Sequence, residues 1–518
     1  MVHLGAARLL TVGGMVAAIA CGCTQVSGLN GLTFGPGDGG GGNLTTGPGG
    51  GGGGTGGSEG PQGGGGTREP SGECGVSLEA RHAWSTALTS AGLVEVTHIV
   101  PLSAGKSLLV VKQDGDITLP NGTIPARENA HLLVRVDDEG RIEAASQLST
   151  ESDDSVEGDE KGDTFTVTAA RANAEGRVFI AGKLAGGIAV DGKLSADPDS
   201  ATPHSYILEV NPGGGFGSFG YFTDTNQLDI ADLAIDDEQI WAVGSYAGSG
   251  GEPVGRIAAY RVEAAITYDG HTDLAVPRSS FARIAAFDDG DLLVSGATES
   301  RFALVDDANG VDVELTSATA SVFVARLRPV HDNNGITWGG MWARVLGGDT
   351  QVSASADVGA DQDTVVVAGH FRGAALLGTD TQVLAQPEPD LFLVRLDATA
   401  GTTLDQTIFP SAGREEISDF VVDEDIYLVG SFRDDLDFGT RQLEQPNATP
   451  FIAQLRLDGG LCLALDIPGA ALERPHLAFG PADRILLGGG FQGTFSAGGP
   501  SLTSDSFQIN GFVAAFAR

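Results

Sequence analysis

Three features of this 518-residue sequence predict an all-β fold made of seven similar sheets. An apolar run that ends in glycine recurs at intervals of roughly sixty residues, and turn residues, chiefly Asp, Gly and Asn, flank each run. No window shows the 3.6-residue apolar period of an amphipathic helix. Short apolar runs bounded by turn residues are typical of buried strands.

The recurring glycine marks the second strand of each unit. It stands at Gly182, Gly244, Gly296, Gly369, Gly430 and Gly489. The first copy, 107–112, has Lys112 in the place of the glycine. One apolar strand precedes each motif across a turn, as at 417–422, and two follow it, as at 451–455 and 462–467. The unit is therefore four antiparallel strands, repeated seven times.

Four-stranded units at a fixed period are the signature of a β-propeller. One such sheet cannot bury both faces alone, whereas sheets packed in a ring can. The last copy stops at Arg518 after its third strand, and residues 80–88 resemble the fourth strands found elsewhere. We therefore expect a propeller over 74–518 in which 80–88 pairs with 512–516 and completes the last blade, which removes an exposed edge.

The repeat resembles the SBBP-like propeller repeats of bacterial exported lipoproteins. The clearest copies are "DEDIYLVGSFRDDLDFG" at 423–439 and "DTVVVAGHFRGAALLG" at 363–378, the latter followed by "DLFLVRLD" at 390–397. The resemblance covers about 90–518, and every copy is partial. It implies a propeller and export, and it implies no reaction.

Residues 1–20 have the form of a lipoprotein-type signal peptide. Arg8 precedes an uncharged, mostly apolar run at 9–20, which is too short to span a bilayer. The stretch Ala-Ile-Ala-Cys at 18–21 resembles a bacterial lipobox, which implies that Cys21 is lipidated; Cys23 is the alternative acceptor. The alternative interpretation is an ordinary A-x-A cleavage site and a soluble secreted or periplasmic protein.

Residues 21–73 are expected to form a disordered, glycine-rich tether. The stretch 35–66 holds 20 glycines and three prolines, and nothing in it can bury apolar area. Such a tether suits a folded body held off a membrane by a lipid anchor, so a membrane is one expected partner. We expect an outer-membrane lipoprotein that is a monomer.

The protein is strongly acidic, with 68 acidic and 30 basic residues and a formal net charge of −38. This field repels phosphate backbones, so nucleic acid is not an expected partner. The acidic run at 153–163 offers oxygen ligands for calcium, but it lacks the EF-hand order, which favours a solvated loop between blades. No other cofactor or metal is expected.

Two cysteines lie outside the signal region. Cys74 and Cys462 are expected to form a disulfide in an oxidising compartment, joining the approach to the closing strand to the fourth strand of the sixth copy. Two buried free thiols are the alternative. No CxxC, CxxH or HExxH motif supports a zinc site.

Aligning the first strands of the copies yields weak channel candidates. Asp232, Asp419 and His476 fall at equivalent depths near the central channel, with Asp419 and His476 in adjacent blades. Such a pairing could support acid–base chemistry or hold a metal. The other equivalent positions in this alignment are Ile99, Ala169, Ile284 and Ser355. We therefore expect no ring of ligands.

Two functional hypotheses follow. The first is a non-enzymatic binding or interaction scaffold at the cell envelope, with a protein or glycan partner. The alternative is a propeller enzyme, a lyase or a quinone-type dehydrogenase, with its site at the mouth of the channel. The enzyme would need His, Arg and Asp to converge from several first strands, and the fold alone decides neither hypothesis.

Overall fold

The computed structural model describes residues 81–518 apart from short gaps. The gaps are 104, 121, 128, 152–163, 192, 197–201, 212–214, 223–227, 237, 249, 300–301, 305–312, 316–320, 333–334, 349–351, 360–361, 379–381, 386–387, 482 and 505–507. Every regular element within the described residues is a β-strand, β1 to β37. In the same residues there is no helix of the length and apolarity that a membrane crossing requires.

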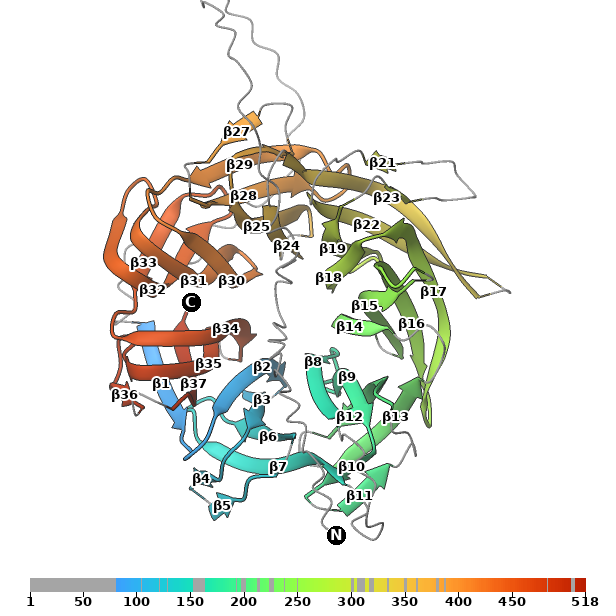
Figure 1. Ribbon diagram of the computed structural model, residues 1–518, viewed down its shortest axis with the longest axis vertical. Helices are drawn as coiled ribbons and strands as arrows, with labels where there is room; N and C mark the ends of the chain where they lie inside the picture. Colours follow the sequence, from blue (N-terminus) through green and yellow to red (C-terminus); the bar gives the residue numbers. More distant parts are fainter. Residues whose placement is uncertain are drawn as a thin grey trace, which may run out of the picture. The chain divides into compact units, whose positions relative to one another are not determined.

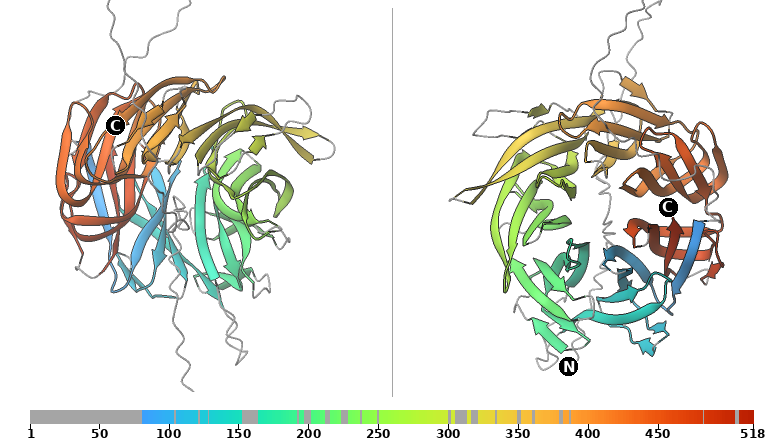
Figure 2. Two further views of the ribbon diagram at one scale, coloured as in Figure 1. Left: turned by 45° about the horizontal axis from the view of Figure 1, so that its top comes forward. Right: turned by 180° about the vertical axis from the view of Figure 1, so that it is seen from behind.

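Seven four-stranded antiparallel sheets form the blades of a propeller, which confirms the predicted fold class (Figures 1 and 2). The inner strands are β2 (Val94–Leu102), β8 (Thr164–Ala172), β14 (Asp229–Asp236), β18 (Ser279–Ala286), β24 (Val352–Val358), β30 (Glu415–Val422) and β34 (Ala470–Gly480). The second strands are β3 (Lys106–Gln113), β9 (Val178–Ala185), β15 (Gln239–Ala247), β19 (Leu292–Thr298), β25 (Thr364–Phe371), β31 (Asp425–Asp437) and β35 (Arg484–Phe495).

The outer half of each blade is built in the same way. The third strands are β6 (Ala130–Val136), β12 (His204–Val210), β16 (Pro253–Val262), β22 (Ser321–Asp332), β28 (Asp390–Asp397), β32 (Gln442–Arg456) and β37 (Asn510–Ala517). The outer strands are β7 (Ile142–Glu151), β13 (Phe216–Phe222), β17 (Ile266–Pro277), β23 (Gly335–Gly348), β29 (Thr403–Phe409), β33 (Leu461–Asp466) and, in blade seven, β1 (His82–Leu88).

Nine short strands lie outside the four main strands of the blades, within the described residues. They are β4 (Ile117–Leu119), β5 (Gly122–Ile124), β10 (Gly187–Val190), β11 (Lys193–Ala196), β20 (Phe302–Leu304), β21 (Val313–Leu315), β26 (Ala374–Leu377), β27 (Gln382–Leu384) and β36 (Leu502–Thr503). Two of them link neighbouring blades, because β10 pairs with the outer strand of blade one and β26 with that of blade four.

The hydrophobic core is divided among the interfaces between blades. Seven clusters of buried side chains are present, and each combines residues of two adjacent blades. The cluster between blades seven and one, for example, joins Leu486 and Val513 to Val96 and Leu109. Each blade therefore buries both faces only through its neighbours.

The ring is closed by strands from opposite ends of the propeller. β1 pairs antiparallel with β37, with Trp84 opposite Ala515 and Leu88 opposite Gly511, so a strand lies at 82–88, within the segment expected at 80–88. The Trp84 indole also donates a hydrogen bond of 2.8 Å to the carbonyl of Asp138 in blade one. The closing strand thus connects blade seven to the blade that follows it in the ring.

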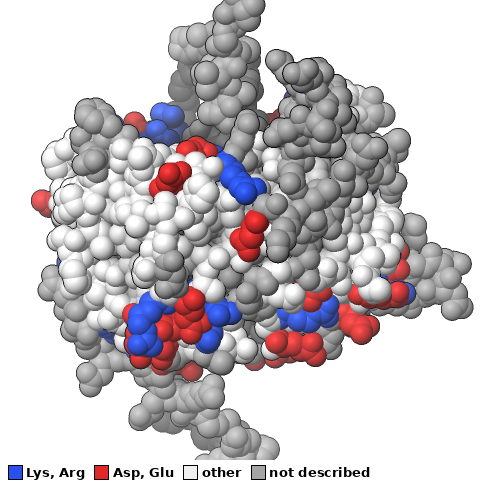
Figure 3. Space-filling view, turned by 90° about the horizontal axis from the view of Figure 1, so that it is seen from below, with Lys and Arg blue, Asp and Glu red and all other residues white. Residues whose placement is uncertain are grey.

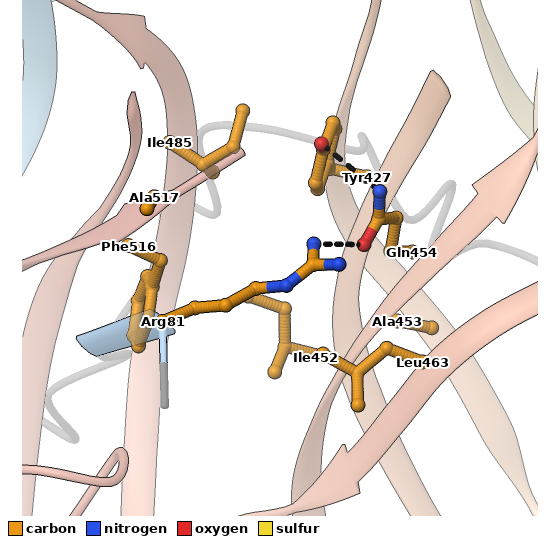
Figure 4. Close-up of a pocket in the computed structure, with 9 residues that line it drawn as sticks. All are labelled: Arg81, Tyr427, Ile452, Ala453, Gln454, Leu463, Ile485, Phe516 and Ala517. Atoms are coloured by element: carbon orange, nitrogen blue, oxygen red, sulfur yellow. Dashed lines mark hydrogen bonds between the residues drawn. The ribbon is translucent and has the colours of Figure 1, made fainter. Parts of the chain in front are cut away.

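A small pocket lies between blades six and seven, next to the closing strand (Figure 4). Its lining is Arg81, Tyr427, Ile452, Ala453, Gln454, Leu463, Ile485, Phe516 and Ala517. Arg81 crosses it and donates a 2.5 Å hydrogen bond to Gln454 Oε1. The remaining space suits about one water molecule, so we interpret the pocket as part of the closure.

The recurring glycine is required by close backbone approach. A Cβ atom at Gly182, Gly244, Gly296, Gly369 or Gly430 would lie 1.8–2.1 Å from a carbonyl oxygen of the inner strand. In blade seven the inner strand has a wider irregularity, and the same distance at Gly489 is 3.0 Å. In blade one the equivalent residue is Val111, opposite Val96 and Leu132, and not Lys112 as the sequence alignment predicted. That alignment was displaced by one residue.

Substituting Gly430 by alanine should therefore destabilise the protein by about 3 kcal/mol, because the new methyl group would meet Glu416 O at 2.1 Å and the Phe451 ring at 2.8 Å. Gly340→Ala is the matched control, because nothing lies within 4 Å of its Cβ position. Its effect should stay within about 0.5 kcal/mol. Equal free energies of unfolding for the two variants, measured with denaturant, would contradict this explanation.

Removal of the closing strand should expose the edge of β37. A chain that begins at Leu93 keeps all seven inner strands but lacks β1, so it should melt at a lower temperature or aggregate through that edge. A chain that begins at Cys74 keeps β1 and should melt like the full chain. Equal melting temperatures for the Leu93 and Cys74 chains would rule out a stabilising role for β1.

Candidate functional site

The inner strands carry a repeated irregularity that sets which residues share one depth. In six of the seven blades the pairing of the inner strand with the second strand shifts by an extra residue or more; β24 pairs regularly. In each of these six strands we take the first residue that is paired again after the shift, and in β24 we take Ser355 as its equivalent. In chain order the seven residues are His98, Ala169, Asp232, Arg283, Ser355, Asp419 and His476. Five of these seven residues are His, Asp or Arg.

This finding corrects the sequence alignment in two blades. The position held by Asp232, Asp419 and His476 in their blades is held by His98 in blade one and by Arg283 in blade four. The alignment had placed Ile99 and Ile284 there. A bulge inserts a residue without changing the apolar pattern, and an error of one residue selects the opposite face of a strand. The alignment therefore missed two polar residues at this depth, and it placed Ala169 and Ser355 correctly.

Arg171 and Asp357, each two residues after the position just described in its inner strand, complete the site. We define the channel cluster as His98, Arg171, Asp232, Arg283, Asp357, Asp419 and His476. These side chains come from blades one to seven, and the contacts described next connect them in two groups, one of which is the pair Arg171–Asp232.

Asp419 lies at the centre of the contacts. Its Oδ1 accepts hydrogen bonds from the amide of Phe420 at 2.9 Å and from Arg283 Nη1 at 3.2 Å. Its Oδ2 accepts one from the amide of Leu477 at 2.9 Å and lies 3.7 Å from His476 Nδ1. Burial alone would raise the pKa of Asp419, but the nearby His476 imidazole and the charge of Arg283 hold it at about 2. The carboxylate is therefore ionised and fixed.

Arg283 reaches from blade four over blade five to blade six. Its guanidinium donates to Ser355 Oγ at 3.4 Å and to the carbonyl of Phe420 at 3.2 Å, and it lies 3.8 Å from Asp357 Oδ2. Burial would lower the pKa of Arg283, but Asp419 and Asp357 raise it above its ordinary value. Burial also raises the pKa of Asp357, and Arg283 opposes that effect. This arginine is the electrostatic centre of the cluster.

A second ion pair joins blades two, three and four. Arg171 Nη2 lies 2.8 Å from Asp232 Oδ1, and Asp232 Oδ2 accepts a hydrogen bond of 3.2 Å from the amide of Ile284. Asp232 also accepts one from the amide of Leu233. Asp232 is thus separate from the Asp419–His476 pair, and Arg283 lies in blade four, one of the two blades between Asp232 and Asp419.

The two histidines lie side by side in blades one and seven. Their rings are stacked with centroids 5.9 Å apart and an interplanar angle of 12°. The His98 ring lies 3.1 Å from Thr97 Oγ1, and burial, followed by the charge of His476, lowers the pKa of His98 to about 3. His98 is therefore a neutral imidazole. The His476 side chain is 31% exposed, so it is more accessible than its partner Asp419.

The other predicted sites have separate outcomes. Cys462, in β33, is disulfide-bonded, but Cys21, Cys23 and Cys74 lie outside the described residues, so the pairing with Cys74 stays a prediction. The acidic run at 153–163 also lies outside them.

Among the described residues, one group of three acidic or metal-ligating side chains lies close enough to hold an ion: Asp137, Asp138 and Glu139 in the β6–β7 turn. Asp137 is occupied there, because it accepts hydrogen bonds from the amides of Glu139 and Arg141 and pairs with the Arg141 guanidinium. On the face drawn in Figure 3, basic side chains lie next to acidic ones. The surface charges are therefore largely arranged in pairs there.

Comparison with known proteins adds no family. No family model matches the chain, and no curated protein matches it. Similar solved structures include the Dos1 propeller, with 9% identity over 85% of this chain and 95% of the other and a TM-score of 0.40. BamB from Moraxella catarrhalis has 11% identity over 83% and 100%, with a TM-score of 0.35. The polysaccharide lyase Uly1 has 9% identity over 82% and 90%, with a TM-score of 0.39. These values carry no inference about function, and the resemblance to SBBP-like repeats stays a prediction.

The depressed pKa of Asp419 predicts a contribution to stability that is lost in acid. A carboxyl group with a folded pKa of about 2, against an ordinary 3.8, favours folding above about pH 4, and this contribution is lost as the pH falls toward 2. Across that range the wild type should lose about 2 kcal/mol more than Asp419→Asn does. Denaturant unfolding at several pH values measures the difference. Parallel pH profiles for the two proteins would show that Asp419 is not held ionised by its partners.

Proposed function

We propose that this chain is an exported, lipid-anchored β-propeller that acts as a non-enzymatic binding scaffold at the cell envelope. The observation that carries the non-enzymatic part is the pairing within the channel cluster. Asp232, Asp357 and Asp419 each accept a hydrogen bond from the amide of the next residue and lie against an arginine. Asp419, whose pKa is lowered to about 2, is a poor proton acceptor for a bound molecule, and a hydrogen-bonded network of this kind keeps its groups in place for recognition.

The accessible groups of the cluster define what a partner would meet. Arg171 is 40% exposed and His476 31% exposed, while the carboxylates of Asp232 and Asp419 lie behind them at 7% and 15%. A partner that enters here would meet donor groups backed by acids, which suits a hydroxyl-rich glycan or a polar protein loop. The net charge of −38 disfavours nucleic acid.

Export and anchoring are supported by the sequence. Arg8, the apolar run at 9–20 and the lipobox-like residues at 18–21 support lipidation at Cys21, and the glycine-rich stretch at 35–66 suits a tether. We place the protein at the outer membrane. A soluble secreted or periplasmic protein is the alternative, in which 18–21 acts only as a cleavage site.

One observation favours a second candidate, an enzyme of the lyase or quinone-type dehydrogenase class. Asp419 lies against His476 Nδ1, and a carboxylate in that position orients an imidazole whose other nitrogen can act as a base. Turnover of a uronate-containing polysaccharide, or quinone-dependent reduction of a dye, that disappears in His476→Ala while the melting temperature is kept would favour this enzyme over the scaffold.

Lipidation is tested by metabolic labelling with a fatty acid. The wild type should carry the label and sediment with membranes, whereas Cys21→Ala should lose the label and become soluble. Cys23→Ala is the matched control and should keep both properties. Label that survives in Cys21→Ala but not in Cys23→Ala would move the acceptor to Cys23. An unlabelled, soluble wild type would refute the anchor.

A further inference from the structure

A second polar site is buried where blade five meets blade six. Asp390, the first residue of β28, is 2% exposed, and Glu415, the first residue of β30, is completely buried. Ser411, in the loop that leads into β30, contacts both: its amide donates to Asp390 Oδ1 at 3.2 Å and its Oγ contacts Glu415 Oε1. The same Oγ contacts the carbonyl oxygen of Asp435 in β31.

The site holds more acceptors than donors. The Ser411 hydroxyl has one proton, yet it faces two acceptors, Glu415 Oε1 and Asp435 O, while it accepts a hydrogen bond from the amide of Gly413 at 2.9 Å. Glu415 Oε2 is buried and has no hydrogen-bond partner among the described residues. An isolated buried carboxylate is costly, so such groups are normally neutralised or coordinate a metal.

Glu415 has no ion pair with a basic side chain within the described part of the chain. The charged side chains that act most strongly on Glu415 are Asp390, Asp435 and Glu388, all acidic. Burial, and then the neighbouring acids, raise the pKa of Glu415 to about 8, although Ser411 opposes the shift. Glu415 therefore needs either a proton or a cation.

The propeller contains an uncharged version of the same junction. Residues 411–413 and 90–92 both read Ser-Ala-Gly, and in each the Ser Oγ accepts a hydrogen bond from the amide of the glycine. Where blade seven meets blade one, Asn510 Oδ1 accepts from the amide of Ser90, as Asp390 does from Ser411. The residue equivalent to Glu415 is Val94, which is fully buried.

The fold of this junction thus requires neither acid. Blades two and five also place buried apolar residues, Phe165 and Val352, at the position of Glu415. Asp390 and Glu415 occur together at one junction, whereas Asn510 and Val94 fill the same positions at another. A bound ligand explains the two acids better than packing does.

We propose that Asp390, Glu415, Ser411 and the carbonyl of Asp435 form a calcium-type cation site between blades five and six. The donor set consists of oxygen only, from two carboxylates, a hydroxyl and a carbonyl, and calcium accepts such ligands in irregular arrangements. A bound ion would neutralise both acids and tie β28, the loop before β30 and β31 together. This site is independent of the channel cluster and of the proposed scaffold function.

The test uses the full chain with Ca²⁺ as the probe. In the wild type, Ca²⁺ should raise the melting temperature above that in EDTA in a saturable manner, and titration calorimetry should find one site that weakens at least tenfold in Glu415→Gln. The double variant Asp390→Asn/Glu415→Val copies the junction of blades seven and one. It should fold in EDTA at least as stably as the wild type and lose this site.

Asp138→Asn, in the half-buried β6–β7 turn, is the matched control and should keep the site. Identical Ca²⁺ titrations for the wild type and the double variant would overturn the proposal, because binding would then come from other acids of this −38 protein. A wild type that ignores Ca²⁺, while its stability titrates near pH 8 only when Glu415 is present, would overturn it in favour of a buried proton.

Discussion

A four-stranded sheet with two apolar faces needs a neighbour on each side, and this requirement governs the architecture of the protein. The seven buried clusters lie at the seven interfaces between blades, so the stability of each blade depends on two others. Closure by β1 satisfies the requirement for blades seven and one, because the cluster between them includes Leu88 of β1 together with Val94 of β2. The recurring glycine serves the same end, since it lets the second strand approach the inner strand closely.

Ring packing also explains where polar groups can be tolerated. The inner strands converge on the axis, so side chains at one depth on different blades come within contact distance, as Arg283 of blade four does with Asp419 of blade six. Charges are retained there because each acid has an amide and an arginine. At the junction of blades five and six, Glu415 has neither a basic partner nor a hydrogen bond to Oε2 within the described part of the chain.

The fold could be predicted from the sequence because its signals are local and repeated. A glycine after an apolar run, turns on either side and a missing last strand are all visible without coordinates. The channel cluster could be predicted only in part. Asp419 and His476 were placed together correctly, but His98 and Arg283 were missed because a bulge shifts the register without changing the apolar pattern. The site around Glu415 could not be found, because its residues span 390–435 and meet only once blades five and six pack.

The positions that break the repeat are therefore the informative ones. A residue shared by most blades, such as the glycine, reports on packing that every blade must satisfy. The pairs His98–His476, Arg283–Asp419 and Asp390–Glu415 each occur at positions where other blades carry alanine, serine, asparagine or valine. Since those other blades fold with small or neutral residues, the fold does not demand these charges. Chemistry specific to this protein is thus to be sought at the channel and at the junction of blades five and six.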